Sequence, residues 1–518
     1  MTSVEAHDVI VLGSSPNELV CACLLAKAGR KVTVIERRSE IGGTSAFRDV
    51  APGFRLQPTP PHSGWVAPKI IKELGLESRG FVQEWSDVAV VTPQKDGPAL
   101  VLHRDLAKSR AEIAKHSERD AKAFEPFAVR MHTLAGFLET LFEKEPPRIT
   151  SDQVSDLLDV MAAGLRLRRL GASSMIDLLR TLPMSVQDLL DDTFENDLLK
   201  ATIGAGGITN LLQGPRSAGT CFVLLHHLVG RPLGAFRARA IVKSENGHLL
   251  GVLERTAKEL GVSMKTGEAA RILVKDGRAH AVILGSGVEL TARTIVSGFD
   301  PKTTFLSLVD PTELDPELVR AVTNVKLRGA RAMVNLALDS LPRFRGVPEN
   351  ALGGIVSIGD HLDYLERAYD DAKHGEVSKN LVLEASIPSL TDPSLAPPGK
   401  HVMSVAVQYV PHRVATSEAL ADRVIATLAE YAPGLEKSVV GRALFGPKDF
   451  EEQYGCAEGN LYGGELTLDQ ILFMRPLPGL SHYATPLEGL FMCGSACHPG
   501  GGLHGLAGAN AAREVLKR

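Results

Sequence analysis

The sequence predicts an α/β fold with more than one domain, and three observations support this prediction. The chain has 518 residues, whereas single hydrophobic cores stop growing at roughly 250–300 residues. Near its beginning, residues 8–36 alternate between strand and helix patterns. Near its end, a short apolar run leads into three consecutive glycines and a helical pattern. A parallel sheet covered by helices explains such alternation.

The first elements form a βαβ unit of the Rossmann type. Residues 8–12 are a continuous apolar run, which is typical of a buried parallel strand. Gly13 ends this strand, a helical pattern follows, and residues 31–36 form the second strand. Glu36 lies 23 residues after Gly13 (36 − 13), near the spacing at which an acidic side chain binds a ribose. The order of elements therefore predicts a dinucleotide site.

The turn departs from the usual G-x-G-x-x-G pattern, since its six residues read GSSPNE from Gly13. Ser15 replaces the glycine that admits the pyrophosphate, and Glu18 replaces the glycine that permits close packing. Ser15, Pro16 and Glu18 also match a helix capping box. A carboxylate here repels a diphosphate by about 1 kcal/mol per charge pair. Two interpretations follow: a retained site with Glu18 turned aside, or a Rossmann-like unit without its ligand.

The residues after Glu36 favour FAD over NAD. Arg37 and Arg38 are followed by Gly42, Gly43 and Thr44. This extension brings positive charge and bare backbone to the place where a second phosphate and a ribityl chain would run. A nicotinamide site does not need it, although a plain glycine turn is the other interpretation.

The C-terminal segment predicts the surroundings of the redox ring. Residues 489–493 read as a strand, Gly500, Gly501 and Gly502 follow, and residues 503–517 read as a helix. Backbone N–H groups before a helix favour an electron-rich edge such as the flavin N1–C2=O region. A flexible glycine loop is the alternative.

These motifs resemble the phytoene desaturase (carotenoid oxidoreductase) family, and most of all its branch of pyridine nucleotide-disulphide oxidoreductase domain-containing proteins. The resemblance is carried by ERR and IGG after the second strand, by residues 194–230, by residues 459–476, and by CGSACHPGGGLHGLAGANAA from Cys493. It implies a glutathione-reductase-like FAD domain, discontinuous in sequence, together with a mixed α+β substrate domain. It also implies oxidation of C–H or C–C bonds in apolar substrates.

We expect each domain to combine separate pieces of chain. The FAD-binding domain is predicted from residues 1–75, 237–298 and 455–518. The substrate domain is predicted from residues 76–236 and 299–454, with a largely helical insertion at 105–228. Its sheet is expected from the apolar runs at 332–338, 380–385 and 401–409.

The residues expected to bind FAD lie in the turn, after the second strand and in the C-terminal segment: Gly13, Ser15, Pro16, Asn17, Glu36, Arg37, Arg38, Gly42, Gly43, Thr44, Gly494, Ser495, Gly501, Gly502 and Leu503. The resemblance adds Ala269, with its backbone against adenine. A flavin accepts the hydride at N5, so the protein supplies orientation, shielding and a proton acceptor. His498, His227 and His62 are weak candidates for that acceptor, a structural histidine is the alternative for each, and no general base is assigned.

Other patterns mark further residues near the expected site. Cys497 is expected to be a buried inert thiol, with a covalent flavin link as the alternative. Arg475 and Asp469 are expected to pair with each other. Residues 157–170 combine apolar and basic side chains. They read as a core-facing helix, and a peripheral membrane contact is the second interpretation.

Composition excludes several classes of protein. A net charge of −4 gives no electrostatic reason to expect nucleic acid. The six cysteines are scattered and suit reduced thiols, and no spacing suggests a metal site. No apolar stretch reaches the ~20 residues of a membrane span, and no signal peptide pattern is present. We therefore expect a cytoplasmic location.

The function expected is that of an FAD-dependent dehydrogenase, desaturase or oxidase. Its substrate is expected to be a hydrophobic or amine-bearing small molecule, and oxygen, a quinone and a nicotinamide remain alternatives for the electron acceptor. A degenerate family member that acts as a binding or scaffold protein is the alternative, because Glu18 stands in the turn. An NAD-dependent dehydrogenase would require the terminal glycines to be incidental.

Overall fold

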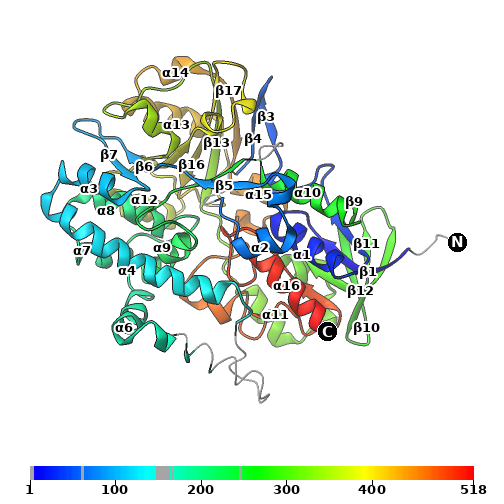
Figure 1. The fold of residues 1–518 in the computed structure, drawn as a ribbon. Coiled ribbons are helices and arrows are strands. Elements are labelled where there is room, and N and C mark those ends of the chain that lie inside the picture. The colour runs from blue at the N-terminus through cyan, green and yellow to red at the C-terminus, as the bar shows by residue number, and fades with distance from the viewer. Residues whose placement is uncertain (1–4, 60–63, 147–160, 162–163, 166, 244–247) are drawn as a thin grey trace.

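The computed structural model describes residues 5–59, 64–146, 161, 164–165, 167–243 and 248–518. Within these residues two seven-stranded sheets organise the molecule, and helices cover them (Figure 1). The architecture confirms the α/β prediction.

The first sheet has the order β10-β11-β12-β1-β2-β9, and β18 pairs with β12. Neighbouring strands run parallel from β18 through β12, β1 and β2 to β9. These parallel strands are β1 (Glu5–Leu12), β2 (Val32–Glu36), β9 (Ser263–Thr266), β12 (Glu289–Ser297) and β18 (Leu490–Met492). An antiparallel hairpin extends the sheet through β10 (Ala269–Lys275) and β11 (Arg278–Leu284).

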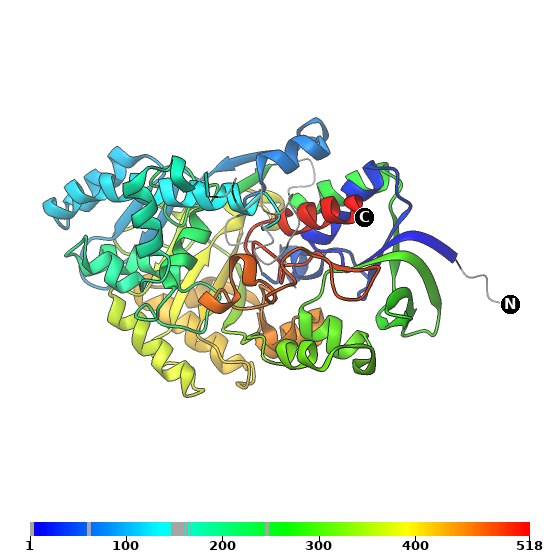
Figure 2. The ribbon, with the colours of Figure 1, turned by 90° about the horizontal axis from the view of Figure 1, so that it is seen from below.

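Three helices from distant parts of the chain pack around the start of the Rossmann unit. They are α1 (Pro16–Lys27), α10 (Leu249–Glu259) and α16 (Leu506–Lys517). All residues from Pro16 to Leu25 of α1 are buried, because the helix is covered by the sheet and by both other helices. The first and last helices therefore lie side by side, as both ribbon views show (Figures 1 and 2).

The second sheet has the order β17-β13-β16-β15-β14-β6-β7. Its strands are β6 (Val88–Thr92), β7 (Leu100–His103), β13 (Arg331–Leu338), β14 (Ile355–Ile358), β15 (Val382–Ser386), β16 (His401–Gln408) and β17 (Val439–Phe445). The three apolar runs predicted as strands are β13, β15 and β16, which confirms them. All pairings are antiparallel except β14 with β6.

The described part of the predicted insertion is mainly helical. Its helices are α3 (Leu106–Ala114), α4 (Glu118–Phe142), α6 (Ala172–Thr181), α7 (Val186–Asp191), α8 (Asp197–Gly204) and α9 (Thr220–Leu228). Beside the second sheet lie α12 (Leu362–Lys373), α13 (Glu418–Tyr431) and α14 (Leu435–Ser438). The smaller helices elsewhere are α2 (Pro68–Leu74), α11 (Pro316–Thr323) and α15 (Pro447–Tyr454).

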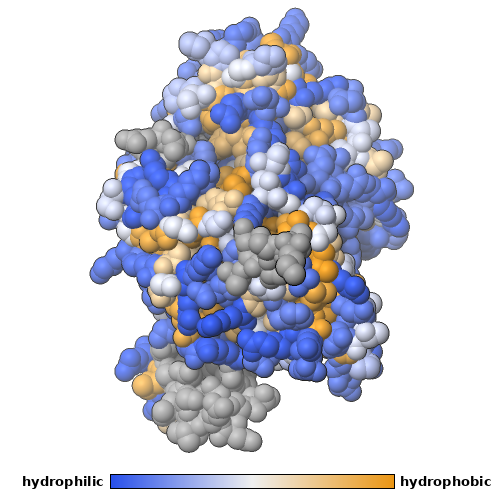
Figure 3. Space-filling model, turned by 90° about the vertical axis from the view of Figure 1, so that its right-hand side faces the viewer, coloured by the Kyte–Doolittle hydropathy of each residue, from blue (hydrophilic) through white to orange (hydrophobic). Residues whose placement is uncertain are grey.

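Two short ribbons complete the fold. One joins β3 (Arg48–Ala51) to β4 (Phe54–Leu56), and the other joins β5 (Val82–Trp85) to β8 (Ala240–Lys243). On the face seen in Figure 3, hydrophilic residues predominate and hydrophobic ones gather toward the middle. Among the described helices, none combines the length and the hydropathy that a membrane crossing requires.

Candidate functional site

The two ends of the chain meet at the predicted site. The Asn17 side-chain amide donates to the Ser495 hydroxyl over 3.3 Å. A Cβ added to Gly508 would lie 1.8 Å from the Asn17 carbonyl oxygen, so α16 approaches α1 as closely as only glycine permits. The opening turn and the terminal glycine segment are therefore in direct contact, as the nucleotide hypothesis requires.

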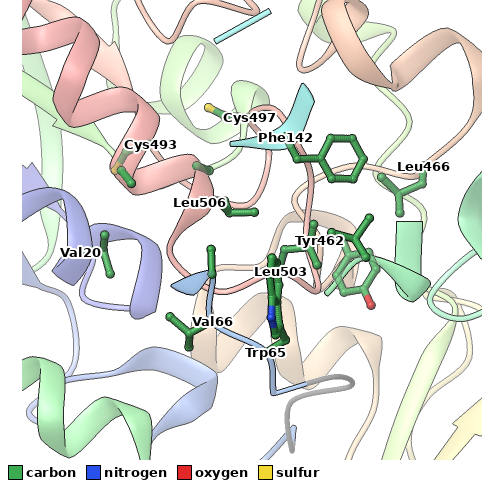
Figure 4. Packing of buried hydrophobic residues seen from close by; sticks show 14 of the residues in the cluster. Val20, Trp65, Val66, Phe142, Tyr462, Leu466, Cys493, Cys497, Leu503 and Leu506 are labelled. Carbon is green, nitrogen blue, oxygen red and sulfur yellow. The ribbon is translucent and has the colours of Figure 1, made fainter. Parts of the chain in front are cut away.

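Apolar packing fixes the terminal segment in place. Figure 4 shows Trp65 and Val66 beside Leu503 and Leu506, with Tyr462 nearby. All five side chains are buried. Residues far apart in the chain thus share one core beside the site.

Three cavities follow one another along this contact. The turn cavity is lined by Gly13, Glu36 and Gly298, the central cavity by Asn17, Tyr462 and Gly502, and the apolar cavity by Phe47, Leu250 and Ile387. The turn and central cavities share Ser15, Thr44, Leu461 and Ser495. The central and apolar cavities share Pro16, Ser45 and His504. Because neighbouring cavities share lining residues, they lie in a row, and we call this row of cavities the groove.

Most residues predicted to bind FAD line this groove. Those in the turn cavity are Gly13, Ser15, Glu36, Arg37, Gly43, Thr44 and Ser495. Those that line the central cavity are Ser15, Pro16, Asn17, Thr44, Ser495, Gly502 and Leu503. Residues from four separate stretches of sequence therefore face one elongated space.

Two of the glycines predicted to bind FAD lie behind the residues that line the groove. Gly494 lies against the backbone of Gly298, because an added Cβ would be 1.9 Å from that carbonyl oxygen. Gly501 lies against the Tyr462 ring, with an added Cβ 2.4 Å away. Both positions allow close approach between two segments, and neither residue is part of the lining.

Three other predicted residues lie outside the cavity walls. Arg38 donates to the Gln453 carbonyl oxygen over 2.8 Å, and its guanidinium lies 4.4 Å from the centre of the Tyr454 ring. Its guanidinium therefore contacts α15. Gly42 has a φ of +115° and packs against Leu250. Ala269 begins β10 and lines none of the three cavities of the groove.

Glu36 is held by a local hydrogen-bond network. The Ser14 hydroxyl donates to one carboxylate oxygen, and the Arg38 backbone N–H donates to the other over 3.0 Å. Ser14 itself accepts from the Gly42 N–H over 2.8 Å. Since each carboxylate oxygen accepts about two hydrogen bonds, Glu36 keeps capacity for a ribose hydroxyl.

Glu18 lies in the wall of the turn cavity with only 3% of its surface exposed. Its side chain packs between Gly13 and Gly298. The Ser15 hydroxyl donates to the Glu18 carboxylate and caps no backbone amide, so the serine half of the predicted capping box is wrong. Burial raises the pKa of Glu18 to about 7, against the lowering effect of the Ser15 hydrogen bond. Burial therefore favours the neutral form of this carboxyl, which weakens its repulsion of a diphosphate.

The residues present fit an FAD molecule. Gly13 has a φ of +98° in the tight turn, and the groove leads from Glu36 to the terminal glycines. In the central cavity, the side-chain oxygens of Asn17 and Asn210 are buried and lack any hydrogen-bond partner among the described residues. Such orphaned groups are rare unless a ligand or water satisfies them. A polar heterocycle between these two amides would do so.

The candidate histidines occupy different positions. His498 is buried beside the Leu141 carbonyl oxygen at 3.2 Å, and burial lowers its pKa to about 4. His227 is hydrogen-bonded to the Tyr462 hydroxyl at 3.1 Å, and burial holds its pKa well below the usual value. Neither lines any of the three cavities of the groove, and His62 lies outside the described residues. His504 does line the central and apolar cavities, with its pKa lowered to about 4 by burial.

The predicted pair of Arg475 and Asp469 is wrong. Asp469 pairs with Lys326 at 2.8 Å. Arg475 is 1% exposed and donates to backbone carbonyl oxygens that include those of Tyr462 at 2.8 Å and Ser495 at 3.0 Å. The guanidinium therefore ties the segment after Tyr462 to the glycine segment, a role that sequence proximity does not reveal.

The cysteines form no disulfide. All six cysteines are free, and Cys497 is buried. Burial raises the pKa of the Cys497 thiol to about 12, so it stays protonated and unreactive at neutral pH. Within the described ranges no His, Cys, Asp and Glu side chains gather as a metal site.

Sequence reasoning missed several residues of the site. Asn210, Arg331 and Tyr462 line the central cavity. Tyr462 lies in the segment 459–476 that carried the family resemblance, so a signal existed for it. Arg331 begins β13 and had none. Of residues 157–170, the positions 157–160, 162–163 and 166 lie outside the described residues. Met161 and Leu165 are 61% and 50% exposed, whereas Leu167 and Leu170 pack against the core. The peripheral membrane contact stays a prediction.

Comparison with known proteins agrees with this site. The family described as flavin-containing amine oxidoreductase matches residues 19–516. The chain is 33% identical to pyridine nucleotide-disulfide oxidoreductase domain-containing protein 2 of Mus musculus, over 99% of this chain and 93% of that protein. It is 27% identical to a limonene dehydrogenase component of Castellaniella defragrans, over 100% of this chain and 96% of that protein. It is 21% identical to a lycopene-forming phytoene desaturase of a Paracoccus species, over 99% of this chain and 98% of that protein.

A solved structure shows the same fold. That of a putrescine oxidase double mutant superposes with a TM-score of 0.62 at 17% identity, over 99% of this chain and 100% of that chain. Together with the relatives, it confirms the resemblance inferred from the motifs.

Proposed function

Since the chain belongs to the family of flavin-containing amine oxidoreductases and is an FAD-dependent oxidoreductase, we propose that it oxidises a hydrophobic or amine-bearing small molecule by hydride transfer to FAD. The observation that carries this proposal is the groove, whose far end opens into a cavity with apolar walls. The names of two relatives support an apolar substrate, because limonene and phytoene are hydrocarbons. The family description supports an amine.

Different residues along the groove have different roles. Gly13, Ser15 and Glu36 hold the adenosine diphosphate part. Tyr462 and Leu503 exclude water from the central cavity. Bound FAD supplies a two-electron acceptor for a hydride, and an external acceptor takes the electrons away. His504, neutral at pH 7, borders both the central and the apolar cavity and is placed to accept a proton.

The test is the visible spectrum of the purified protein, followed by anaerobic titration with candidate substrates. We expect flavin absorption bands that bleach when an apolar alkene or an apolar amine is added. Bands that no such compound bleaches would contradict the substrate classes. Protein that stays colourless after soaking in FAD would support the alternative, a scaffold protein whose nucleotide site is blocked by Glu18.

A further inference from the structure

Four arginines lie largely buried within electrostatic reach of Glu384 on β15: Arg231, Arg237, Arg239 and Arg331. Within the described part of the chain, Glu384 is the one carboxylate that forms an ion pair with any of them. Its oxygens contact Arg237 at 2.6 Å and Arg331 at 3.1 Å. Four guanidinium groups thus share one carboxylate and leave three positive charges (4 − 1). Buried charge of this kind is costly unless something pairs with it.

Arg239 is the member of this set that lines the apolar cavity. Its backbone N–H donates to the Ser86 hydroxyl over 3.4 Å. Its guanidinium has no hydrogen bond or ion pair with any residue that the structure describes. Burial and the nearby charge of Arg331 lower its pKa to about 10, so it remains a cation at neutral pH. Arg239 is therefore an unpaired cation among the residues that line the cavity.

The rest of the cavity wall is mainly apolar. It includes Phe47, Leu56, Leu250 and Ile387. Asp392 is its only described carboxylate, and that side chain already accepts from the N–H and hydroxyl of Ser394, at 3.1 Å for the N–H and 2.5 Å for the hydroxyl. The cavity thus offers apolar surface around one free guanidinium, next to the place where the redox ring would lie.

We propose that the substrate is an apolar molecule that carries a carboxylate, which pairs with Arg239 while the apolar body occupies this cavity. The inference rests on the proposed function and narrows its substrate class. A guanidinium binds a carboxylate through two parallel hydrogen bonds, and the surplus charge of the cluster favours an anion over an amine. Arg331, which pairs with Glu384 and lines the central cavity, adds to the attraction.

The experiment compares decanoate, decanol and decylamine, three probes with the same chain length, by calorimetric titration of the FAD-loaded protein. We expect decanoate to bind at least about tenfold more tightly than the other two. Arg239→Met should lower decanoate affinity by about tenfold or more and leave decanol affinity unchanged. Arg367→Met, which removes an exposed arginine of α12, should change neither and serves as the control.

Three outcomes would overturn the inference. The first is decanoate that binds no better than decanol or decylamine. The second is an Arg239→Met variant with unchanged decanoate affinity and a shifted flavin reduction potential, which would assign the charge to the flavin. If Arg239→Met weakens the binding of both decanoate and decanol, the Arg239→Lys variant is titrated with the same two probes. A retained preference for decanoate supports the inference, and a lost preference overturns it. Purified protein that cannot bind FAD would contradict the proposed function and not this inference. The same titration of that protein would still test whether it binds a carboxylate.

Discussion

At the scale of single residues, Glu18 controls the electrostatics of the nucleotide turn. It stands where a glycine would ordinarily sit, and it is almost wholly buried against Gly13 and Gly298. Burial disfavours the charged carboxylate, so the pKa rises to about 7. The charge that a diphosphate would meet therefore depends on pH within the neutral range.

Replacing Glu18 with Gln should remove this dependence. The charge of the wild-type carboxyl develops as the pH rises through about 7, and repulsion of about 1 kcal/mol per charge pair should lower FAD affinity several-fold. Glu18→Gln should bind FAD several-fold more tightly than the wild type at pH 8.5 and equally well at pH 5.5. Quenching of flavin fluorescence gives both dissociation constants.

Glu36→Gln is the matched control, because it alters another buried glutamate of the same cavity. It should weaken FAD binding at both pH values, since an amide is a poorer acceptor for ribose hydroxyls. Equal FAD affinities of the wild type and Glu18→Gln at pH 8.5 would mean that the Glu18 carboxylate does not face the phosphates.

The same pKa shift predicts how Glu18 affects the stability of the protein without FAD. The folded-state pKa, about 7, lies above the ordinary value of 4.5. Between these values the folded state binds more protons than the unfolded state, so the contribution of Glu18 falls as the pH rises. Relative to the wild type, the free energy of unfolding of Glu18→Gln should rise by about 3 kcal/mol from pH 4.5 to pH 8. Urea unfolding across this range measures the difference, and a constant difference would contradict the prediction.

At the scale of elements, the contact between α1 and α16 joins the ends of the chain. Gly508 lets the two helices meet, because an added Cβ would overlap the Asn17 carbonyl oxygen. Gly508→Ala should force the helices apart, lower the free energy of unfolding by about 1–3 kcal/mol, and weaken FAD binding. Urea unfolding and fluorescence titration measure the two effects.

Gly136→Ala provides the control for a glycine inside a helix. Gly136 lies in α4, and an added Cβ there has no neighbour within 4 Å. Alanine should raise the free energy of unfolding by about 0.5–1 kcal/mol and leave FAD binding unchanged. If Gly508→Ala behaved like Gly136→Ala, the close helix contact would not matter for the site.

Elements with a strong local pattern could be predicted from the sequence. The strands β1, β2 and β18 follow from apolar runs that end at glycine or at an acidic residue. The last helix begins at Leu506 and not at Leu503, because Gly505 adopts a φ of +79° as its N-cap. The capping box failed for a different reason: the Ser15 hydroxyl binds a carboxyl that tertiary packing buries. Burial of that kind is not encoded in the spacing of residues.

At the scale of the whole molecule, the sequence predicted one end of the groove better than the other. The turn, Glu36 and the terminal glycines have motifs, so their meeting could be expected. Tyr462, Arg331 and Arg239 reach the groove from separate segments. Their roles depend on how the second sheet packs against the first, and no local pattern reports such packing.

The groove predicts that FAD stabilises the whole molecule. Its walls come from the opening turn, the second sheet and the terminal segment, so unfolding of any of them releases the cofactor. A ligand that binds only the folded state at 100 times its dissociation constant adds about 2.7 kcal/mol to the free energy of unfolding. Thermal unfolding of FAD-free protein should therefore shift upward with FAD and continue to rise as its concentration increases.

NAD at the same concentrations separates the two dinucleotides in that experiment. NAD has the adenosine diphosphate part but no isoalloxazine ring to fill the central cavity between Asn17 and Asn210. It should raise the melting temperature much less than FAD does. An equal shift with NAD would mean that the turn cavity alone binds the ligand, and the contact between the two ends of the chain would then have no part in holding a flavin.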